Sequence, residues 1–343
     1  MSKERMGWVD IAKIFGLIIV LMNHADLVIG PVNFLGGMFY VPIFFVLAGY
    51  TYKYRPEVAF YEVIKKKAKR LLIPYAAYNG LLFLFFFLKD SVLPGSIGAA
   101  SFRPLFGILY SRSYLYAGAL EGQEVLMTIL NGPTWFLTGL FTASLGFEWL
   151  CRRVKGDTKK LGIALVVSFV IAWGMDVLVP VLLPWSIDTM FMHLVLMGLG
   201  YLLKENKDLE LLEEKRVRIL VYAVLFLITS CLSGTGNLSI RSYGQVAVFY
   251  LWAAYFGSVL VMLFSRWMER HCEKAAKVLA YAGGRTMGIL CLHLFVFMFF
   301  RAGLGVIGFP ADNPLAKAVM IPVTFAVLTV FETLLERRPY GRK

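Results

Sequence analysis

The chain has 343 residues, of which 59% are hydrophobic and 17% charged, and its formal net charge is +13. Soluble domains have roughly 45–50% apolar and about 25% charged residues, so this composition excludes a disordered or fibrous protein and favours a bilayer as solvent. The apolar residues form long runs without amphipathic periodicity, which predicts an all-α membrane protein. Four cysteines form no CxxC pair, so neither a disulfide framework nor a zinc site is expected.

Ten segments are long and apolar enough to cross a bilayer, since a spanning helix needs about 20 apolar residues. We expect a polytopic bundle of about ten transmembrane helices within one integral membrane domain, residues 1–343. The first span is too long for a signal peptide and lacks a cleavage site, so we interpret it as a permanent anchor. The predicted spans are 11–29, 34–54, 71–88, 133–151, 161–179, 187–203, 217–233, 242–265, 278–300 and 315–335.

Lysine and arginine are distributed unequally between the two sides of these spans. Of the 35 basic residues, 27 lie in the two terminal flanks and alternate connections, whereas only five lie in the opposite connections. Basic flanks stay in the cytoplasm, so both termini are expected there. The same distribution explains the net charge without nucleic acid as a partner. The connection 89–132 is the long outer segment and is expected to be functional or partly buried.

Polar side chains inside the predicted spans are few. Each is a functional candidate, because a charge within the hydrocarbon costs about 2.5–3.5 kcal/mol or more. The candidates in the first span are Asp10, Lys13, Asn23, His24 and Asp26. Those in the later spans are Asp176, His193, Arg285, His293 and Glu332.

Lys13 and His24 project from one face of the first span, because eleven residues complete about three helical turns. Asp10 lies one turn before Lys13 and is placed to neutralise it. A neutral imidazole accepts a proton near pH 7, which suits His24 to general-base work on a hydroxyl. Simpler interpretations are also open: a hydrogen bond from His24 to a neighbouring helix, and a Lys13 side chain that snorkels to the interface.

The segment 65–70, KKKAKR, concentrates cations on the predicted cytoplasmic side. Lys65, Lys66, Lys67 and Arg70 are suited to phosphates, or alternatively to anionic lipid headgroups. The preceding PIFFVLAGY, residues 42–50, has proline, alanine and glycine in one helix, which allows a kink and a close approach of backbones.

The remaining polar candidates have simpler interpretations. Asp176 and Asp188 flank the predicted outer turn 180–186 and are expected to be solvated. His193 is interpreted as a residue that hydrogen-bonds within the bundle. Asp26 is expected to be a solvated helix-end residue, with orienting His24 or contacting an acceptor as the alternatives.

Several segments resemble acyltransferase family 3, the integral membrane O-acyltransferases of bacterial cell-envelope glycans, which include fucose 4-O-acetylase-like proteins. WVDIAKIFGLIIVLMNH, residues 8–24, resembles the family's opening of Trp-x-Asp, a basic residue, ten residues and a histidine. Further matches are FYVPIFFVLAGY (39–50), the pair Lys67 and Arg70 before LLIPY, PTWFL (133–137) and GGRTMGILCLH (283–293). Two departures are Ala48, where serine is usual, and Lys67, where arginine is usual; lysine lacks the planar fork for a bidentate phosphate contact.

The resemblance implies acetyl-CoA or a related acyl-CoA as cytoplasmic donor. It implies as acceptor a hydroxyl of an extracytoplasmic glycan or of its lipid-linked precursor, at the bacterial inner membrane, and no metal is expected. His24 is the expected general base, with Lys13, Asp10 and Asn23 as further catalytic candidates. The expected CoA-binding residues are Lys65, Lys66, Lys67 and Arg70. The expected substrate-contacting or supporting residues are Trp135, Arg285, His293 and Asp26.

Direct transfer is preferred over an acyl-enzyme, because no serine or cysteine lies one turn from His24. Arg285, Asn23 and backbone N–H groups are alternatives for stabilising the oxyanion. Two other classes of function are open: a transporter or flippase, which also uses buried ionisable residues and broken helices, and a membrane module that serves a partner enzyme. No inverted repeat is visible between the two halves, which disfavours the transporter.

Overall fold

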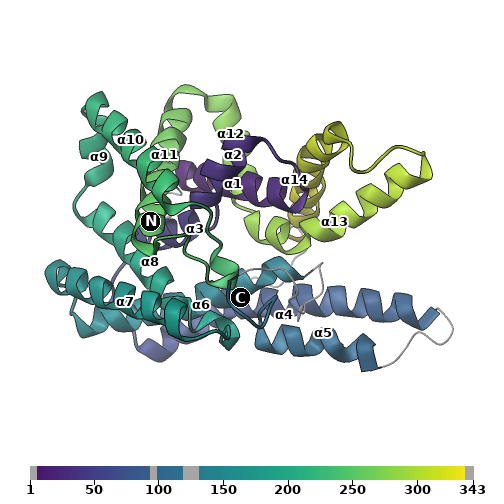
Figure 1. Ribbon diagram of the computed structural model, residues 1–343, viewed down its shortest axis with the longest axis horizontal. Helices are drawn as coiled ribbons and strands as arrows, with labels where there is room; N and C mark the ends of the chain where they lie inside the picture. Colours follow the sequence, from purple (N-terminus) through teal and green to yellow (C-terminus); the bar gives the residue numbers. More distant parts are fainter. Residues whose placement is uncertain (1–5, 93–98, 119–130, 337–343) are drawn as a thin grey trace. The chain divides into compact units, whose positions relative to one another are not determined.

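The computed structural model describes residues 6–92, 99–118 and 131–336, and every regular element in these ranges is a helix (Figure 1). The predicted all-α architecture is therefore confirmed. The predicted outer connection 89–132 is described only in part, since 93–98 and 119–130 lie outside these ranges, as do the flanks 1–5 and 337–343.

Eight helices of the described ranges are long and apolar enough to cross a membrane, or nine if the bent pair α2 (Gly30–Phe39) and α3 (Pro42–Tyr50) is one span. The eight are α1 (Gly7–His24), α4 (Phe60–Val92), α7 (Thr158–Leu178), α8 (Met190–Glu205) counted together with the preceding segment from Pro184, α10 (Arg216–Ser233), α11 (Ala247–His271), α13 (Thr286–Val306) and α14 (Pro314–Glu336). The chain is thus a multi-pass membrane protein.

The predicted span 133–151 corresponds to α6 (Trp135–Arg153), which is not among these helices. It carries Glu148, Arg152 and several hydroxyl side chains, which lower its hydropathy, so its crossing of the membrane stays a prediction. The remaining helices are α5 (Ala99–Tyr110), α9 (Asp208–Glu213), α12 (Glu273–Gly283) and three short 3-10 helices, η1 (Gly132–Thr134), η2 (Pro184–Ser186) and η3 (Leu238–Ile240).

The helices differ from the predicted spans in two places. The predicted span 278–300 is two helices, α12 and α13, separated after Gly283. A Cβ at Gly283 would overlap the backbone carbonyl of Asp10, so glycine allows α12 to end directly against α1. The connection 55–70 is helical from Phe60, and α4 is about 50 Å long, which exceeds a hydrocarbon core of about 30 Å. The basic residues therefore lie on a helical extension of a span.

Two compact units make up the chain. The first comprises residues Met1–Ile43 and Gly257–Lys343. Within it, α1 packs against α2, α12, α13 and α14, and α13 lies beside α14 (Figure 1). A Cβ at Gly36 of α2 would overlap the Ile19 side chain of α1, so this glycine lets the two helices pack closely.

The second unit comprises residues Phe44–Phe256. In it α6 packs against α4 and α8, α7 packs against α8, and α4 lies beside α5 (Figure 1). A Cβ on Gly49 would overlap the Met197 carbonyl, and one on Gly200 would overlap the Val46 carbonyl. The predicted close approach of the 42–50 helix is therefore confirmed, with α8 as its neighbour.

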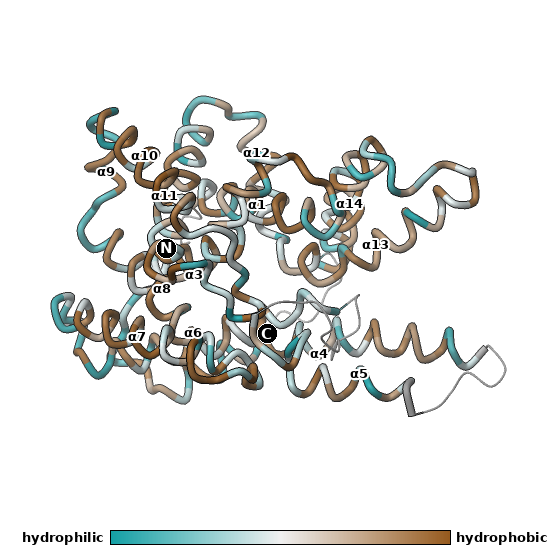
Figure 2. The backbone as a smooth tube through the Cα atoms, in the orientation of Figure 1, coloured by the Kyte–Doolittle hydropathy of each residue, from teal (hydrophilic) through white to brown (hydrophobic). Residues whose placement is uncertain are grey.

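The helices differ in how much of their apolar surface the protein itself covers. About two thirds or more of the apolar segment of α1, α8 and α11 is buried, compared with a third or less for α4, α7, α10, α13 and α14. Hydrophobic residues line the helices and hydrophilic residues gather at loops and helix ends (Figure 2). Exposed apolar surface of this extent is stable in lipid, where backbone groups are satisfied within each helix.

Candidate active site

Two imidazoles meet in the first unit, where α1 ends. His24 is the last residue of α1, and His293 lies within α13. The atoms His24 Nδ1 and His293 Nε2 are 2.7 Å apart. The ring planes are inclined by 17° with centroids 4.9 Å apart, so the rings meet edge to edge and the hydrogen bond lies near both planes. His293 is fully buried, whereas His24 is exposed.

The backbone of α13 determines which nitrogen of each ring carries a proton. His293 Nδ1 lies 3.0 Å from the Ile289 oxygen and 2.9 Å from the Leu290 oxygen. Carbonyl oxygens only accept, so His293 Nδ1 donates and His293 Nε2 holds the lone pair. His24 Nδ1 must then donate to His293, which leaves the lone pair of a neutral His24 on Nε2. We call these two residues the histidine pair.

Charged side chains collect directly after His24, where the chain turns. Asp26 adopts a left-handed φ of 54°, which aspartate tolerates better than most residues. Its carboxylate lies 3.5 Å from Arg301 Nη2 of α13, and its backbone oxygen accepts a hydrogen bond of 3.2 Å from Lys317 Nζ of α14. We call Asp26, Arg301 and Lys317 the outer rim, because the distribution of basic residues predicts this end to face outward.

Asn23 helps to hold this turn in place. Its side-chain oxygen accepts a hydrogen bond of 2.9 Å from Asn33 Nδ2 of α2, which also donates to the Leu27 oxygen at 3.1 Å. Asn33 Oδ1 in turn accepts from the Ile29 backbone N–H at 2.6 Å. The bond from Asn33 uses the side-chain oxygen of Asn23 and does not involve its amide nitrogen, which is the donor that an oxyanion would need.

Asp10 and Lys13 lie in the first half of α1, distant from His24 along the helix. Lys13 Nζ is 2.9 Å from Asp10 Oδ1, and this one-turn ion pair has a nearly buried carboxylate. Leu17 and Val20, which separate Lys13 from His24, are buried. Among the described contacts none joins Lys13 to His24, so α1 carries a neutralised ion pair in its first half and the histidine pair at its end.

Arg285 precedes α13 and is directed away from the histidine pair. Its guanidinium forms an ion pair with Glu336 and lies 3.8 Å from the Tyr281 ring centroid. Arg285 Nη1 also donates to the backbone carbonyl oxygen of Tyr281 at 2.9 Å. These partners occupy both Nη atoms of a guanidinium that lies eight residues before His293, so those atoms would have to leave them to act as oxyanion donors.

In the second unit the basic segment 65–70 lies in the first turns of α4. Lys65, Lys66 and Arg70 are exposed, and Lys67 is half-buried. Residues three and four apart are neighbours on a helix, so Lys66, Lys67 and Arg70 share one face. Such a face presents several cationic donors to a polyanion.

A buried carboxylate that was not anticipated from the sequence lies near these cations. Glu148 of α6 is within Coulombic range of Lys67, accepts a 2.8 Å hydrogen bond from the Tyr52 hydroxyl, and forms a 2.7 Å ion pair with Arg152 Nε. Lys204 Nζ donates to the backbone carbonyl oxygen of Tyr52 at 2.6 Å. Burial raises the pKa of Tyr52 above its usual range, as do Cys151 and Glu148 beside it, so the phenol stays a donor.

His193 and Trp135 lie together in the interior of the second unit. The His193 ring stacks on Phe45 at a centroid distance of 3.9 Å, and the Trp135 ring lies 6.4 Å from it. Neither ring nitrogen of His193 has a hydrogen-bond partner among the described residues. The interpretation of His193 as a hydrogen-bonding residue is therefore wrong: it packs as an aromatic ring.

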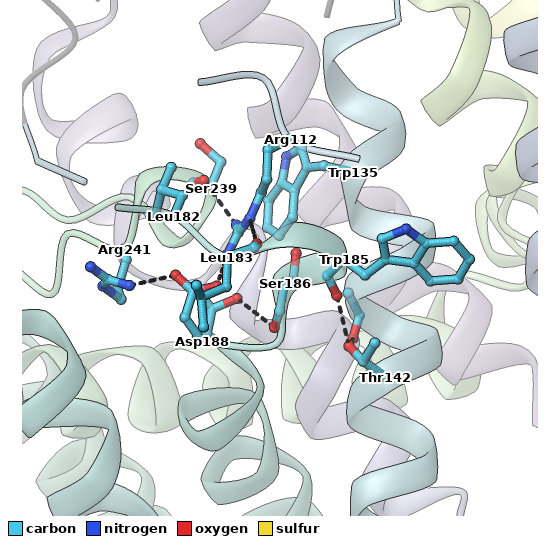
Figure 3. A network of polar contacts seen from close by, with 12 residues as sticks. Arg112, Trp135, Thr142, Leu182, Leu183, Trp185, Ser186, Asp188, Ser239 and Arg241 are labelled. Atoms are coloured by element: carbon cyan, nitrogen blue, oxygen red, sulfur yellow. Dashed lines mark hydrogen bonds and ion pairs between the residues drawn. The ribbon is translucent and has the colours of Figure 1, made fainter. Parts of the chain in front are cut away.

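Asp188 is not solvated, contrary to expectation. It lies between two arginine side chains, at 2.6 Å from Arg241 Nη1 and in an ion pair with Arg112, and all three side chains are fully buried (Figure 3). Arg112 also donates to the oxygens of Leu183 at 2.9 Å and Ser239 at 3.2 Å. We call Arg112, Asp188 and Arg241 the buried ion triad.

The triad joins three loops that are far apart in sequence. Burial lowers the pKa of Arg112, and the neighbouring Asp188 carboxylate opposes that shift. Arg241 additionally donates to the oxygens of Val179 and Val181. One sequence signal existed: Arg112 and Arg241 are among the few cations in the predicted outer connections, where a cation needs a local reason to be present.

Comparison with known proteins gives one match. A family model described as an acyltransferase domain matches residues 6–333, nearly the whole chain. No curated protein and no solved structure is detectably similar to it.

Proposed function

The chain belongs to acyltransferase family 3 and is a membrane acyltransferase; from this premise we propose that it moves an acetyl or short acyl group from cytoplasmic acyl-CoA to a hydroxyl. The acceptor hydroxyl in this proposal belongs to an extracytoplasmic or lipid-linked glycan of the bacterial inner membrane. His24 is the general base of the proposed reaction.

The observation that carries this proposal is the proton arrangement of the histidine pair. His293 Nδ1 is held by two carbonyls, so its Nε2 accepts from His24 Nδ1 and fixes the free lone pair on His24 Nε2. His24 is an exposed residue, and none of the described hydrogen bonds engages its Nε2. A fixed and accessible imidazole lone pair is what deprotonation of an alcohol requires.

The proposed reaction proceeds by direct transfer. His24 Nε2 takes the proton of the acceptor hydroxyl while the alcohol oxygen attacks the thioester carbonyl carbon. The tetrahedral intermediate then collapses, the C–S bond breaks, and the CoA sulfur leaves with the proton from the imidazolium. His293 accepts a hydrogen bond from His24 Nδ1 throughout, and so holds the ring in one tautomer and favours the imidazolium that forms.

Donor binding is assigned to the second unit. Lys65, Lys66, Lys67 and Arg70 are proposed to bind the phosphates of acetyl-CoA or a related acyl-CoA, and Glu148 to hold Lys67 at the buried side of this face. Lysine supplies point charges rather than a planar fork, so the expected phosphate contact is electrostatic and sensitive to salt.

Transfer and binding assays test the proposal against a transporter or a module that serves a partner enzyme. The purified full chain is heated with and without acetyl-CoA, and the same preparation is incubated with labelled acetyl-CoA and extracted envelope glycans. We expect acetyl-CoA to raise the melting temperature and label to appear as base-labile ester. If acetyl-CoA neither raises the melting temperature nor yields labelled ester, the chain is not an acyl-CoA-dependent transferase.

A further inference from the structure

The outer rim places two cations beside the proposed base in a protein that keeps cations off this side. The predicted outer connections contain five basic residues, and Lys317 lies near an outer helix end. Arg112 and Arg241 form ion pairs with Asp188 in the buried ion triad. Arg301 and Lys317, from two different helices, instead converge on Asp26, two residues after His24. A cation pair at this position is not explained by the positive-inside rule.

Asp26 does not engage all the hydrogen-bond donors of Arg301 and Lys317. Its carboxylate lies 3.5 Å from Arg301 Nη2, longer than an ordinary charged hydrogen bond, and only its backbone oxygen contacts Lys317. Arg301 Nε has no hydrogen-bond partner within the part of the chain that the structure describes. The rim therefore has a net charge of about +1 with unused donors, which suits it to an anion.

Exposed apolar residues flank the three rim residues along the chain. These flanking residues are Val28, Ile29, Val306, Ile307, Phe309 and Leu315. Val28 and Ile29 follow Asp26 in the chain. Val306, Ile307 and Phe309 follow Arg301 at and beyond the end of α13, and Leu315 precedes Lys317 at the start of α14. Cations within an exposed apolar border belong at the depth of lipid headgroups, where a phosphate and a lipid tail lie side by side.

From this juxtaposition we propose that the outer rim binds the phosphate of a lipid-linked saccharide, and that such a phosphate-bearing amphiphile is the acceptor. The inference rests on the proposed function and narrows its acceptor class. Arg301 and Lys317 contact the phosphate, the apolar border lies against the lipid tail, and the saccharide hydroxyl is thereby held near His24. A neutral soluble glycan would lack both contacts.

The test separates the phosphate from the tail with four probes. These are farnesyl diphosphate N-acetylglucosamine, octyl β-N-acetylglucosaminide, N-acetylglucosamine 1-phosphate and N-acetylglucosamine. Binding to the full chain in phosphatidylcholine vesicles is measured for the wild type and for Arg301→Gln, Lys317→Gln and the double variant. Lys89→Gln, an exposed cation on the same predicted side, is the matched control. Arg301→Lys keeps the charge and should retain most of the binding.

We expect the double variant to weaken binding of the farnesyl diphosphate sugar by about tenfold or more, and binding of the octyl glycoside by less than about twofold. Lys89→Gln should change neither. Equal binding of both amphiphiles to the wild type, or equal losses in the double variant, would overturn the proposal. Because binding does not need turnover, His24→Gln should bind the farnesyl probe normally whether or not the chain proves to be a transferase.

A second arm distinguishes the acceptor from ordinary phospholipid. Phosphatidylglycerol is added to the vesicles at increasing fractions and binding of the farnesyl diphosphate sugar is measured again. Persistent binding supports an acceptor site. If phosphatidylglycerol abolishes binding to the wild type, the rim is a headgroup site and the proposal is wrong.

Discussion

Polar side chains differ in burial and pairing between two regions of the molecule. One region is the histidine pair with the outer rim, in the first unit, and the other is the buried ion triad, in the second unit. In the triad the three side chains are fully buried, and both guanidinium groups bind Asp188 and several carbonyls. In the first unit His24 is exposed, and Asp26 meets Arg301 only at 3.5 Å. A buried charge without partners is costly, so the charges of the triad are paired within the protein.

This difference separates a structural role from a chemical one. The donors of Arg112 and both Nη atoms of Arg241 are directed to protein atoms, and Arg241 Nε alone in the triad has no partner among the described residues. The triad thus fixes the loops around Arg112, Asp188 and Arg241. The histidine pair satisfies three of its four ring nitrogens and leaves His24 Nε2 outside the network. A lone pair with a fixed direction and no internal partner is available to a substrate.

Replacing the proposed base should give the largest effect. We expect His24→Ala to lower the acyl transfer rate by about 10²–10⁴-fold, because general-base catalysis is lost. The melting temperature should stay close to that of the wild type, since His24 is exposed. His271→Ala, another exposed histidine, is the matched control and should retain full activity.

Breaking the triad should instead affect folding. Asp188→Ala leaves two buried guanidinium groups without their carboxylate, so the free energy of unfolding should fall by about 3–5 kcal/mol. Denaturant titration in detergent measures this, with the exposed Asp312→Asn as control. A stability like that of the wild type would show that the triad does not hold the loops, and the contrast between the two regions would fail.

A change at His293 should reduce catalysis without removing it. His293→Phe keeps a ring but no acceptor for His24 Nδ1–H, so kcat should fall by about 10–100-fold with little change in KM. His293→Gln supplies an amide oxygen and should restore part of the rate. A positioning role also predicts a shifted pH profile of kcat, because the imidazolium of His24 is less stabilised. Equal rates for the phenylalanine and glutamine variants would argue for packing alone.

The basic segment should give the smallest effect, because its cations are mostly exposed. The double change Lys67→Gln and Arg70→Gln should raise KM for acetyl-CoA by about tenfold through lost phosphate contacts, with kcat nearly unchanged. Lys67→Arg should lower KM modestly, because guanidinium binds phosphate in a planar fork. Lys159→Gln, an exposed cation elsewhere, is the control. No change in KM would place donor binding at another surface.

The sequence predicts the helical architecture well because a helix that faces lipid must be apolar over its own length, so its composition alone identifies it. Helix ends are harder to predict: the break after Gly283 depends on the contact of that glycine with Asp10, which hydropathy does not contain. The Asp10–Lys13 pair is predictable since both partners lie one turn apart in one helix.

Contacts between distant segments could not be predicted in the same way. His24 and His293 were both candidates, but their bond joins residues from two helices and depends on how α13 packs against α1. The local sequence of Asp188 resembles an outer turn and predicts a solvated carboxylate. Its two arginines lie 76 and 53 residues away along the chain. Long-range pairing of charges leaves no local pattern.

A double-mutant cycle tests the central claim, that His293 acts through the lone pair of His24. Acyl transfer is measured for the wild type, His24→Ala, His293→Phe and the double variant at equal amounts of folded protein. We predict that His293→Phe slows the wild type by about 10–100-fold but changes the residual rate of His24→Ala by less than about twofold. Independent, additive losses from the two substitutions would contradict the claim, as would full activity of His24→Ala.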